Sequence, residues 1–186
     1  MLYGEKVRLR AIEREDIPRF LKWLNDPSLR RYLDMYLPLS RAQEERWFER
    51  QLEDEKNLVF AIETLEGEHI GNIGLHEIDW KNGQAVLGIF IGEGDYWGQG
   101  YGTDAVRTLL RLAFEEMGLH RISLRVFDFN QRAIRCYEKC GFRHEGRQRE
   151  AHFTEGRYHD VLLMGILAQE FALQEEHSKS KEGGGR

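Results

Sequence analysis

The first third of the chain shows the spacing of amphipathic helices behind one short strand. Residues 7–11 predict the strand. Asp16 is expected to be the N-cap of a helix whose apolar residues between 20 and 24 lie on one stripe. Pro27 ends that helix, because the residue before a proline disfavours the helical region. Ser40 begins a capping box, which predicts a second helix.

Three strand-like segments follow in the middle of the chain. Residues 58–64 and 69–79 are separated by a turn at Glu66-Gly67, and Asn82-Gly83 joins the second segment to a third at 85–91. An Asn-Gly pair between two strand-like runs is typical of a β-hairpin. The third segment, AVLGIFI, is apolar at both parities, so we expect it to be covered on both faces.

The second half of the chain alternates helices and strands. Apolar residues recur at helical spacing between 106 and 117, and residues 122–126 alternate as in a strand. A helix is expected over 130–140, and a final hairpin over 142–153 and 158–167. The order β-α-α-β-β-β-α-β-α-β-β predicts an α+β or mixed α/β layer protein.

Length and composition predict one globular domain. The chain has 186 residues, of which 41% are hydrophobic and 32% charged, as in ordinary folded proteins. We place a single domain at residues 1–170. Residues 175–186, EEHSKSKEGGGR, contain no apolar side chain and predict a mobile polar tail.

Several classes of protein are excluded by what the sequence lacks. No apolar run approaches the roughly 20 residues that span a bilayer, and the first residues have no signal-peptide centre. We therefore expect a cytoplasmic protein without membrane contact. A net charge of −5 argues against nucleic-acid binding by bulk charge. The seven histidines show no HxH or HExxH spacing and the two cysteines lack a partner pair, so no metal is expected.

A glycine cluster marks the first candidate site. Five of the 19 glycines stand between Gly92 and Gly102, where a buried strand meets an amphipathic helix. Backbone N–H groups at a helix N-terminus favour a phosphate, and glycines let the main chain approach that anion. No Lys-Ser/Thr pair follows, which argues against a P-loop. The spacing GxGxG argues against a Rossmann site. A phosphate-binding loop and a plain tight turn both remain as interpretations.

A second constellation, NQRAIRCYEKCGF at residues 130–142, lies one strand–helix unit later. Taken alone, it is explained by helix capping and packing. Together with YWGQGYGTDA at residues 96–105, it resembles the GNAT superfamily of acyl-CoA-dependent N-acetyltransferases. Within that superfamily it is most similar to the Rim-type branch, the ribosomal-protein N-terminal acetyltransferases. The resemblance covers residues 5–168, nearly the whole domain.

The resemblance implies a mostly antiparallel mixed sheet that is splayed between residues 85–91 and 121–127. The pantetheine arm of acetyl-CoA, the implied cosubstrate, would lie in that gap. Asn130 is implied to contact this arm. Arg132 and Arg135 are implied either to meet CoA phosphates or to lie on a solvated helix face. The implied CoA contacts on the strand and loop are Ile89, Phe90, Ile91, Trp97, Gly98, Gln99, Gly100, Tyr101, Gly102 and Thr103.

The resemblance also implies direct transfer, without a covalent enzyme intermediate. Tyr137 matches the family's tyrosine, which would protonate the departing CoA thiolate. The alternative for Tyr137 is a core residue on an amphipathic helix. Cys136 and Cys140 are interpreted as packing residues rather than nucleophiles.

The resemblance does not identify the general base. Relatives in the Rim-type branch carry Glu just before the Leu-Gly of the splayed strand, but Val86 stands there in this chain. The candidates are Glu77 and Asp79 near the end of the preceding strand, and Glu150 on the final hairpin. Each of these three is alternatively a surface carboxylate. Trp97 replaces the Gln or Arg that opens the family's loop, which leaves the backbone amides to hold the pyrophosphate.

We therefore expect an N-acetyltransferase that moves the acetyl group of acetyl-CoA to a primary amine. The acceptor is either a small amine or a protein N-terminus, and residues 26–40 are expected to flank it. The alternative from another class is a CoA-binding sensor or regulatory module without turnover. The final hairpin and the third helix are compatible with a homodimer.

Overall fold

Eight strands form one sheet in the computed structural model, which describes residues 1–182. Their order is β1-β2-β3-β4-β5-β6-β8-β7. Neighbouring strands are antiparallel except β5 and β6, which are parallel. This confirms the predicted mixed, mostly antiparallel sheet. The strands are β1 (Leu2–Tyr3), β2 (Val7–Ala11), β3 (Leu58–Thr64), β4 (His69–Asp79), β5 (Gln84–Ile91), β6 (Arg121–Phe127), β7 (Arg143–Thr154) and β8 (Arg157–Leu167).

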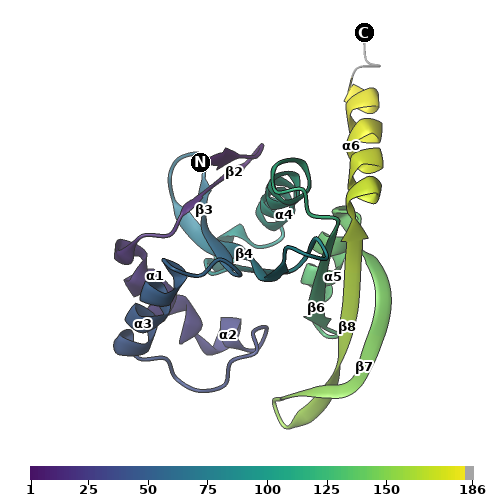
Figure 1. Ribbon diagram of the computed structural model, residues 1–186. Coiled ribbons are helices and arrows are strands. Elements are labelled where there is room, and N and C mark those ends of the chain that lie inside the picture. The colour runs from purple at the N-terminus through teal and green to yellow at the C-terminus, as the bar shows by residue number, and fades with distance from the viewer. Residues whose placement is uncertain (183–186) are drawn as a thin grey trace.

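Helices cover both faces of the sheet, with α1 to α3 on one face and α4 on the other (Figure 1). A π-helical turn, η3 (Leu112–Glu116), extends α4, and α5 packs beside α4. The helices are α1 (Ile17–Leu24), α2 (Pro27–Arg30), α3 (Arg41–Gln51), α4 (Tyr101–Arg111), α5 (Gln131–Lys139) and α6 (Ala168–Glu182), with short 3₁₀ turns η1 (Arg14–Asp16) and η2 (Gly94–Tyr96).

Two hydrophobic clusters hold these layers together. The larger one joins the sheet to α4 and α5 through fully buried residues such as Ile73, Leu109 and Ile122. The smaller one lies under α1 and contains Phe20 and Trp23. Burying apolar side chains of this size stabilises a fold by about 1.5–3 kcal/mol each. The two clusters therefore fix α1 and α4 on opposite faces of β4 and β5.

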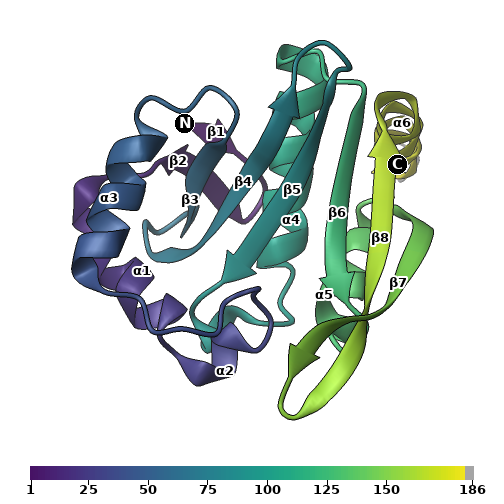
Figure 2. The same ribbon diagram turned by 60° about the horizontal axis from the view of Figure 1, so that its bottom comes forward.

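The sheet opens between β5 and β6. These strands pair at only three positions, where Gln84, Ala85 and Val86 face Arg121, Ile122 and Ser123. Beyond Val86 the two strands diverge, as Figure 2 shows. The backbone groups of β5 after Val86 thus have no partner strand on that side. The predicted splay is confirmed, at the end of the strands that faces the glycine-rich loop.

Asp16 corrects one expectation about the first helix. Its side chain makes no capping hydrogen bond to α1. Both of its carboxylate oxygens accept from Arg10, at 2.8 and 2.7 Å, and one of them lies 3.0 Å from Nδ1 of His69. Burial alone would raise the pKa of Asp16, but Arg10 and His69 hold it well below its usual range. The residue joins β2, α1 and β4, a long-range role that the capping pattern did not show.

Two helices were not predicted. The short helix α2 begins at Pro27, where Asp26 accepts a hydrogen bond from the backbone N–H of Ser28 at 2.8 Å. The last helix, α6, extends through Glu182, so it enters the segment 175–186 that was predicted to be a polar tail. Residues 183–186 lie outside the described residues. Proline is favoured at the first position of a helix, so Pro27 can begin α2 although it ends α1. The start of α6 is held in the core by the buried side chain of Phe171.

The close packing of Gly92 on Trp23 gives a stability prediction. A Cβ at position 92 would lie 2.2 Å from Cδ2 of Trp23, whose indole Nε1 donates to Glu93 at 2.9 Å. The indole cannot shift without losing that bond, so we expect Gly92→Ala to lower the free energy of unfolding by about 2–3 kcal/mol. Chemical denaturation measures this loss. Gly94→Ala is the control, because a Cβ there meets no atom within 4 Å; equal stability of the two variants would contradict the prediction.

Candidate active site

A cavity of about 1020 Å³ lies at the opening of the sheet. Its wall is built from β4 and β5 on one side, from β6 and α5 on the other, and from the start of α4 at one end. The segment after α2 also contributes to the wall: Tyr32, Leu33, Asp34 and Met35 line the cavity, in the stretch predicted to flank an acceptor. The cavity thus joins the split in the sheet to the surface beneath α2 and α3.

The glycine-rich loop forms one end of this cavity. Gly98 and Gly100 have φ angles of 75° and 91°, in the left-handed region that favours glycine. Gly100 is the N-cap residue of α4, so the N–H groups of Tyr101 to Thr103 belong to the first helical turn and have no partner within the helix. These groups and the positive end of the helix dipole form a site for an anion.

The N-terminal strands hold that loop in place. The Asp104 carboxylate accepts hydrogen bonds from the backbone N–H groups of Glu5, Lys6 and Val7, at 3.1, 2.8 and 3.0 Å. The ammonium group of Lys6 donates to the carbonyl of Gln99 at 3.0 Å. The carboxylate of Asp104, in the first turn of α4, is therefore hydrogen-bonded by the backbone of the β1–β2 turn. This leaves the positive helix end open to a ligand.

Arg132 supplies a cation beside the loop. Its guanidinium lies 3.8 Å from the centre of the Trp97 ring and 5.3 Å from that of Tyr32. Burial lowers the pKa of Arg132, which is the effect expected of a half-buried cation in apolar surroundings. Trp97 itself donates through Nε1 to the carbonyl of Ile91 at 2.8 Å. Trp97 thus supports Arg132 and the end of β5, while Arg135 lines the cavity from an exposed position.

The backbone of β5 offers fewer free groups than the sequence suggested. The carbonyl of Ile91 accepts from Trp97 and therefore points away from β4. The N–H of the next residue, Gly92, points toward β4, because it donates to the carbonyl of Ile70 at 2.8 Å. Backbone groups alternate sides along a strand. Ile89 therefore directs its N–H and C=O into the split, as Ile91 does. Phe90 is a correction, since its backbone groups face β4 and its ring packs against Trp23.

Tyr137 lies on α5 at the inner wall of the cavity. It is only 6% exposed, and its ring packs edge-on against Phe142. Burial, together with the neighbouring thiols of Cys136 and Cys140, raises the pKa of Tyr137 well above its ordinary value. The phenol is therefore protonated throughout the working pH range. Asn130 lines the same cavity and caps α5, its side-chain oxygen accepting from Ala133 N at 3.3 Å.

The three carboxylates considered as general bases do not line the cavity. Glu77 and Glu150 are exposed and have left-handed φ angles of 52° and 50°. Each stands in a β-bulge, which turns its side chain outward. Hydrogen bonds from Asn82 lower the pKa of Asp79, which makes this carboxylate a weaker base. The structure thus places all three outside the reaction cavity.

Two titratable residues that the sequence reasoning missed do line the cavity. Glu44 on α3 is 4% exposed, and burial raises its pKa to about 7. His76 on β4 is half-buried beside the split. A signal for Glu44 was available, because it stands one turn before the apolar Phe48 within the predicted helix. An acidic side chain on the apolar side of a helix is unusual and indicates a role.

The described residues offer neither a metal centre nor a membrane-spanning helix. Within residues 1–182, no three His, Cys, Asp or Glu side chains gather in a group suited to a metal ion. Over the same part of the chain, every helix is too short or too polar to cross a bilayer.

Comparisons with known proteins identify the family of the chain. The family model described as an acetyltransferase (GNAT) domain matches residues 6–143. An uncharacterized N-acetyltransferase of Bacillus subtilis, YokL, is 34% identical over 170 residues, which is 91% of this chain and 94% of the relative. A spermidine N(1)-acetyltransferase of Vibrio cholerae is 31% identical over 176 residues, covering 93% and 99% of the two chains.

A solved structure is similar over the same length. The spermidine N-acetyltransferase of Vibrio cholerae, crystallised with CoA and spermine, superposes with a TM-score of 0.84 at 30% identity, covering 89% of this chain and 98% of that one. These findings support the superfamily expected from the two motifs. They do not specifically support the Rim-type branch.

Proposed function

The chain belongs to the GNAT acetyltransferase family and is an acetyl-CoA-dependent N-acetyltransferase, and from this premise we propose that its acceptor is a small molecule with two or more primary amines. The observation that carries the proposal is the buried carboxylate of Glu44 in the cavity. The spermidine acetyltransferase relatives point to the same substrate class. The protein N-terminus, considered as an alternative acceptor, has no support among the relatives reported above.

Acetyl-CoA fits the open half of the cavity. The first-turn amides of α4 and the Arg132 guanidinium suit the pyrophosphate, since both present positive charge to one place. The backbone N–H and C=O of Ile89 and the N–H of Ile91 face the split and suit the amides of the pantetheine arm, while the Ile91 carbonyl accepts from Trp97. The thioester would then lie where β5 and β6 separate, on the side of the phenol of Tyr137.

Two separate positions for an acceptor nitrogen, one at the thioester and one at Glu44, favour an acceptor with two amines. The helix α3 lies over the β3 side of the sheet, away from β6 (Figure 2). A single amine at the split would leave Glu44 unused. A diamine or polyamine places one nitrogen at the thioester and a second, cationic nitrogen at Glu44. Burial penalises the charged carboxylate, and an ammonium ion removes that penalty by pairing with it.

An acetyl-transfer screen tests the proposed substrate class. The panel contains monoamines, diamines, polyamines, amino sugars and peptides, with mass detection of the acetylated product. We expect N-acetylated diamines or polyamines with the highest kcat/KM. Tight CoA binding without turnover across the whole panel would instead favour the sensor or regulatory module. The expected homodimer and the absence of a metal stay predictions of the sequence.

Glu44→Gln gives a sharper test of the acceptor site. The carboxylate is charged above its pKa of about 7, and aliphatic amines stay cationic up to a pKa of about 10.4. We therefore expect KM for a diamine to fall as pH rises from 6 to 8. Glu44→Gln should raise KM about tenfold at pH 8, which is the loss of one charge-assisted hydrogen bond, and should abolish this pH dependence. Steady-state kinetics over that range measures both effects.

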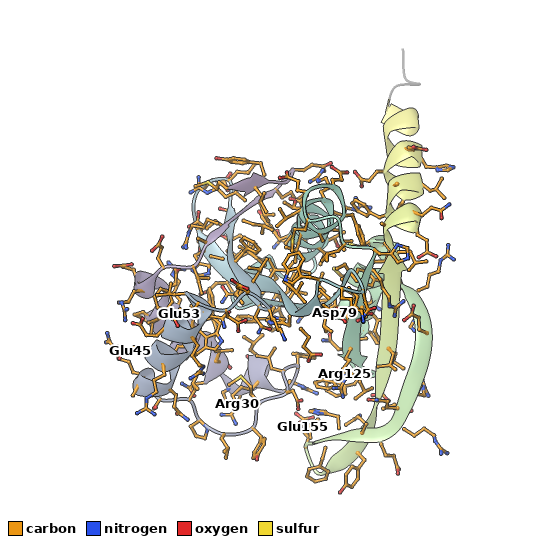
Figure 3. All side chains as sticks on the ribbon, viewed as in Figure 1. Arg30, Glu45, Glu53, Asp79, Arg125 and Glu155 are labelled. Atoms are coloured by element: carbon orange, nitrogen blue, oxygen red, sulfur yellow. The ribbon has the colours of Figure 1, made fainter. Side chains whose placement is uncertain are left out.

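Two controls separate charge pairing from general damage. KM for a monoamine of similar length should not change in Glu44→Gln, because that substrate has no second ammonium. Glu45→Gln should not change KM for either substrate, because Glu45 points to the outer side of α3 and pairs with Arg41 (Figure 3). An equal effect on monoamine and diamine would contradict the assignment of Glu44.

A further inference from the structure

We propose that His76 is the general base of the transfer and that its Nε2 atom takes the proton from the acceptor nitrogen. The proposal rests on the proposed function only in requiring an amine acceptor. Its observations are the position of His76 at the opening of the sheet, the orientation of its ring, and the two glycines that lie against Nε2.

The position follows from the register of the strands. His76 on β4 faces Val86 on β5, and Val86 is the last residue of β5 that pairs with β6. His76 therefore stands beside the point at which the sheet opens. Its ring belongs to the cavity wall. Side chains alternate along strands and His76 pairs with Val86, so it shares a sheet face with Phe90, whose ring packs on Trp23 of α1. An acceptor entering beneath α2 and α3 reaches the split past this ring.

The orientation of the ring is set by Asn57. Nδ1 of His76 lies 3.2 Å from Oδ1 of Asn57. The amide nitrogen of Asn57 donates to Asp54 at 2.7 Å, and its oxygen also accepts from the backbone N–H of Glu77 at 3.3 Å. An amide oxygen can only accept, so Nδ1 of His76 carries the hydrogen. The lone pair is therefore on Nε2.

Two glycines keep Nε2 accessible. Gly74 on β4 and Gly88 on β5 face each other across the ladder. A Cβ at either position would lie 3.2 Å from Nε2 of His76. A larger side chain at position 74 or 88 would thus cover the atom or displace the ring. With glycine at both positions, Nε2 lies over bare backbone, and Gly88 precedes Ile89, whose N–H enters the split.

The charges around His76 suit a base that is neutral at rest. Burial lowers the pKa of His76, while the carboxylates of Glu77 and Asp54 oppose that effect. Other charged side chains line the same cavity from the elements packed around it. They are Asp34 after α2; Glu44, Arg46 and Arg50 on α3; Arg125 on β6; and Arg132, Arg135 and Lys139 on α5. At neutral pH the imidazole is uncharged. Asp54, acting through Asn57, favours the imidazolium once it forms.

The proton balance closes with the groups present. The acceptor reaches the thioester as a neutral amine after losing its ammonium proton to solvent. Its nitrogen bonds to the carbonyl carbon, becomes cationic and passes one proton to Nε2. The C–S bond then breaks with its electron pair on sulfur, and the thiolate takes the phenol proton of Tyr137. Exchange with solvent returns the imidazolium and the phenolate to their resting forms.

His76→Ala tests the proposal by kinetics. We expect kcat to fall about 10²-fold, within the range for loss of a general base, with the dissociation constant for CoA unchanged. The base works only above its pKa, which burial lowers from the ordinary value of histidine, so the wild-type kcat should fall as the pH becomes acidic. The variant should lack this acidic limb. Added imidazole should restore part of kcat, because the space between Gly74 and Gly88 is vacated. His120→Ala, at an exposed site, is the matched control.

A second measurement does not depend on how the variant folds. Nitrogen-15 shifts of the wild-type histidines should show His76 with its hydrogen on Nδ1. Hydrogen on Nε2, or a His76→Ala enzyme with undiminished kcat and an intact acidic limb, would overturn the base assignment while leaving amine acetylation in place. A wild-type enzyme that acetylates no amine would instead overturn the proposed function.

Discussion

Tyr137→Phe is expected to lower kcat by about 10³-fold, the middle of the range for a lost general acid, with little change in CoA affinity. The departing thiolate needs a proton, and burial keeps the Tyr137 phenol protonated. Phenylalanine keeps the ring and its contact with Phe142. Stopped-time assays at saturating acetyl-CoA measure kcat, and calorimetry measures the dissociation constant.

The control for this substitution removes the same atom elsewhere. Tyr158→Phe changes an exposed phenol on the β7–β8 hairpin, 65% of whose residue surface is accessible. We expect its kcat to equal that of the wild type. A Tyr137→Phe enzyme that keeps more than a tenth of wild-type kcat would show that this tyrosine is a core residue of α5. The sequence left that interpretation open beside the catalytic one.

The sequence predicts those parts of the fold that depend on neighbouring residues, such as turns, helix caps and apolar runs. The Asn82-Gly83 pair predicted the β4–β5 hairpin, and the capping box at Ser40 predicted α3, whose cap the structure contains. The apolar residues of β5 predicted a strand covered on both faces. In each case the residues that carry the signal are those that make the contacts, so no distant partner was needed.

The site residues that were missed depend on partners far along the chain. His76 is oriented by Asn57, 19 residues earlier, and Asp16 is occupied by His69, 53 residues later. Glu44 reaches the cavity because α3 packs against α1, which lies on the sheet. The outward turn of Glu77 results from a bulge in β4, and bulges leave a weak signal in the residue pattern. Sequence reasoning therefore identified the glycine-rich loop and Tyr137 as candidates, whereas Glu44 and His76 became candidates only from the structure.

The phosphate loop gives the other prediction with a large effect: Gly100→Val is expected to weaken CoA binding about 10³-fold. Gly100 has a φ of 91°, which a β-branched residue avoids. A Cβ at this position meets no close atom, the nearest being Lys6 Nζ at 3.7 Å, so the effect comes from the backbone and not from a steric clash inside the fold. Moving the start of α4 misdirects two or more N–H groups, each worth about 1.5–3 kcal/mol to a charged ligand. Calorimetry with CoA measures the loss.

A matched control can separate this loss of binding from backbone strain. Gly118, after the π-helical turn, has a φ of 68° and open space around it. Gly118→Val and Gly100→Val should therefore each lower the stability of the fold by about 1–2 kcal/mol, but Gly118 lies at the opposite end of the helix from the glycine-rich loop. Thermal unfolding should show comparable losses in the two variants, whereas only Gly100→Val should lose CoA. If both variants bound CoA as the wild type does, the amides at the start of α4 would not be its pyrophosphate site, and the phosphates would have to depend on Arg132 and its neighbours on α5.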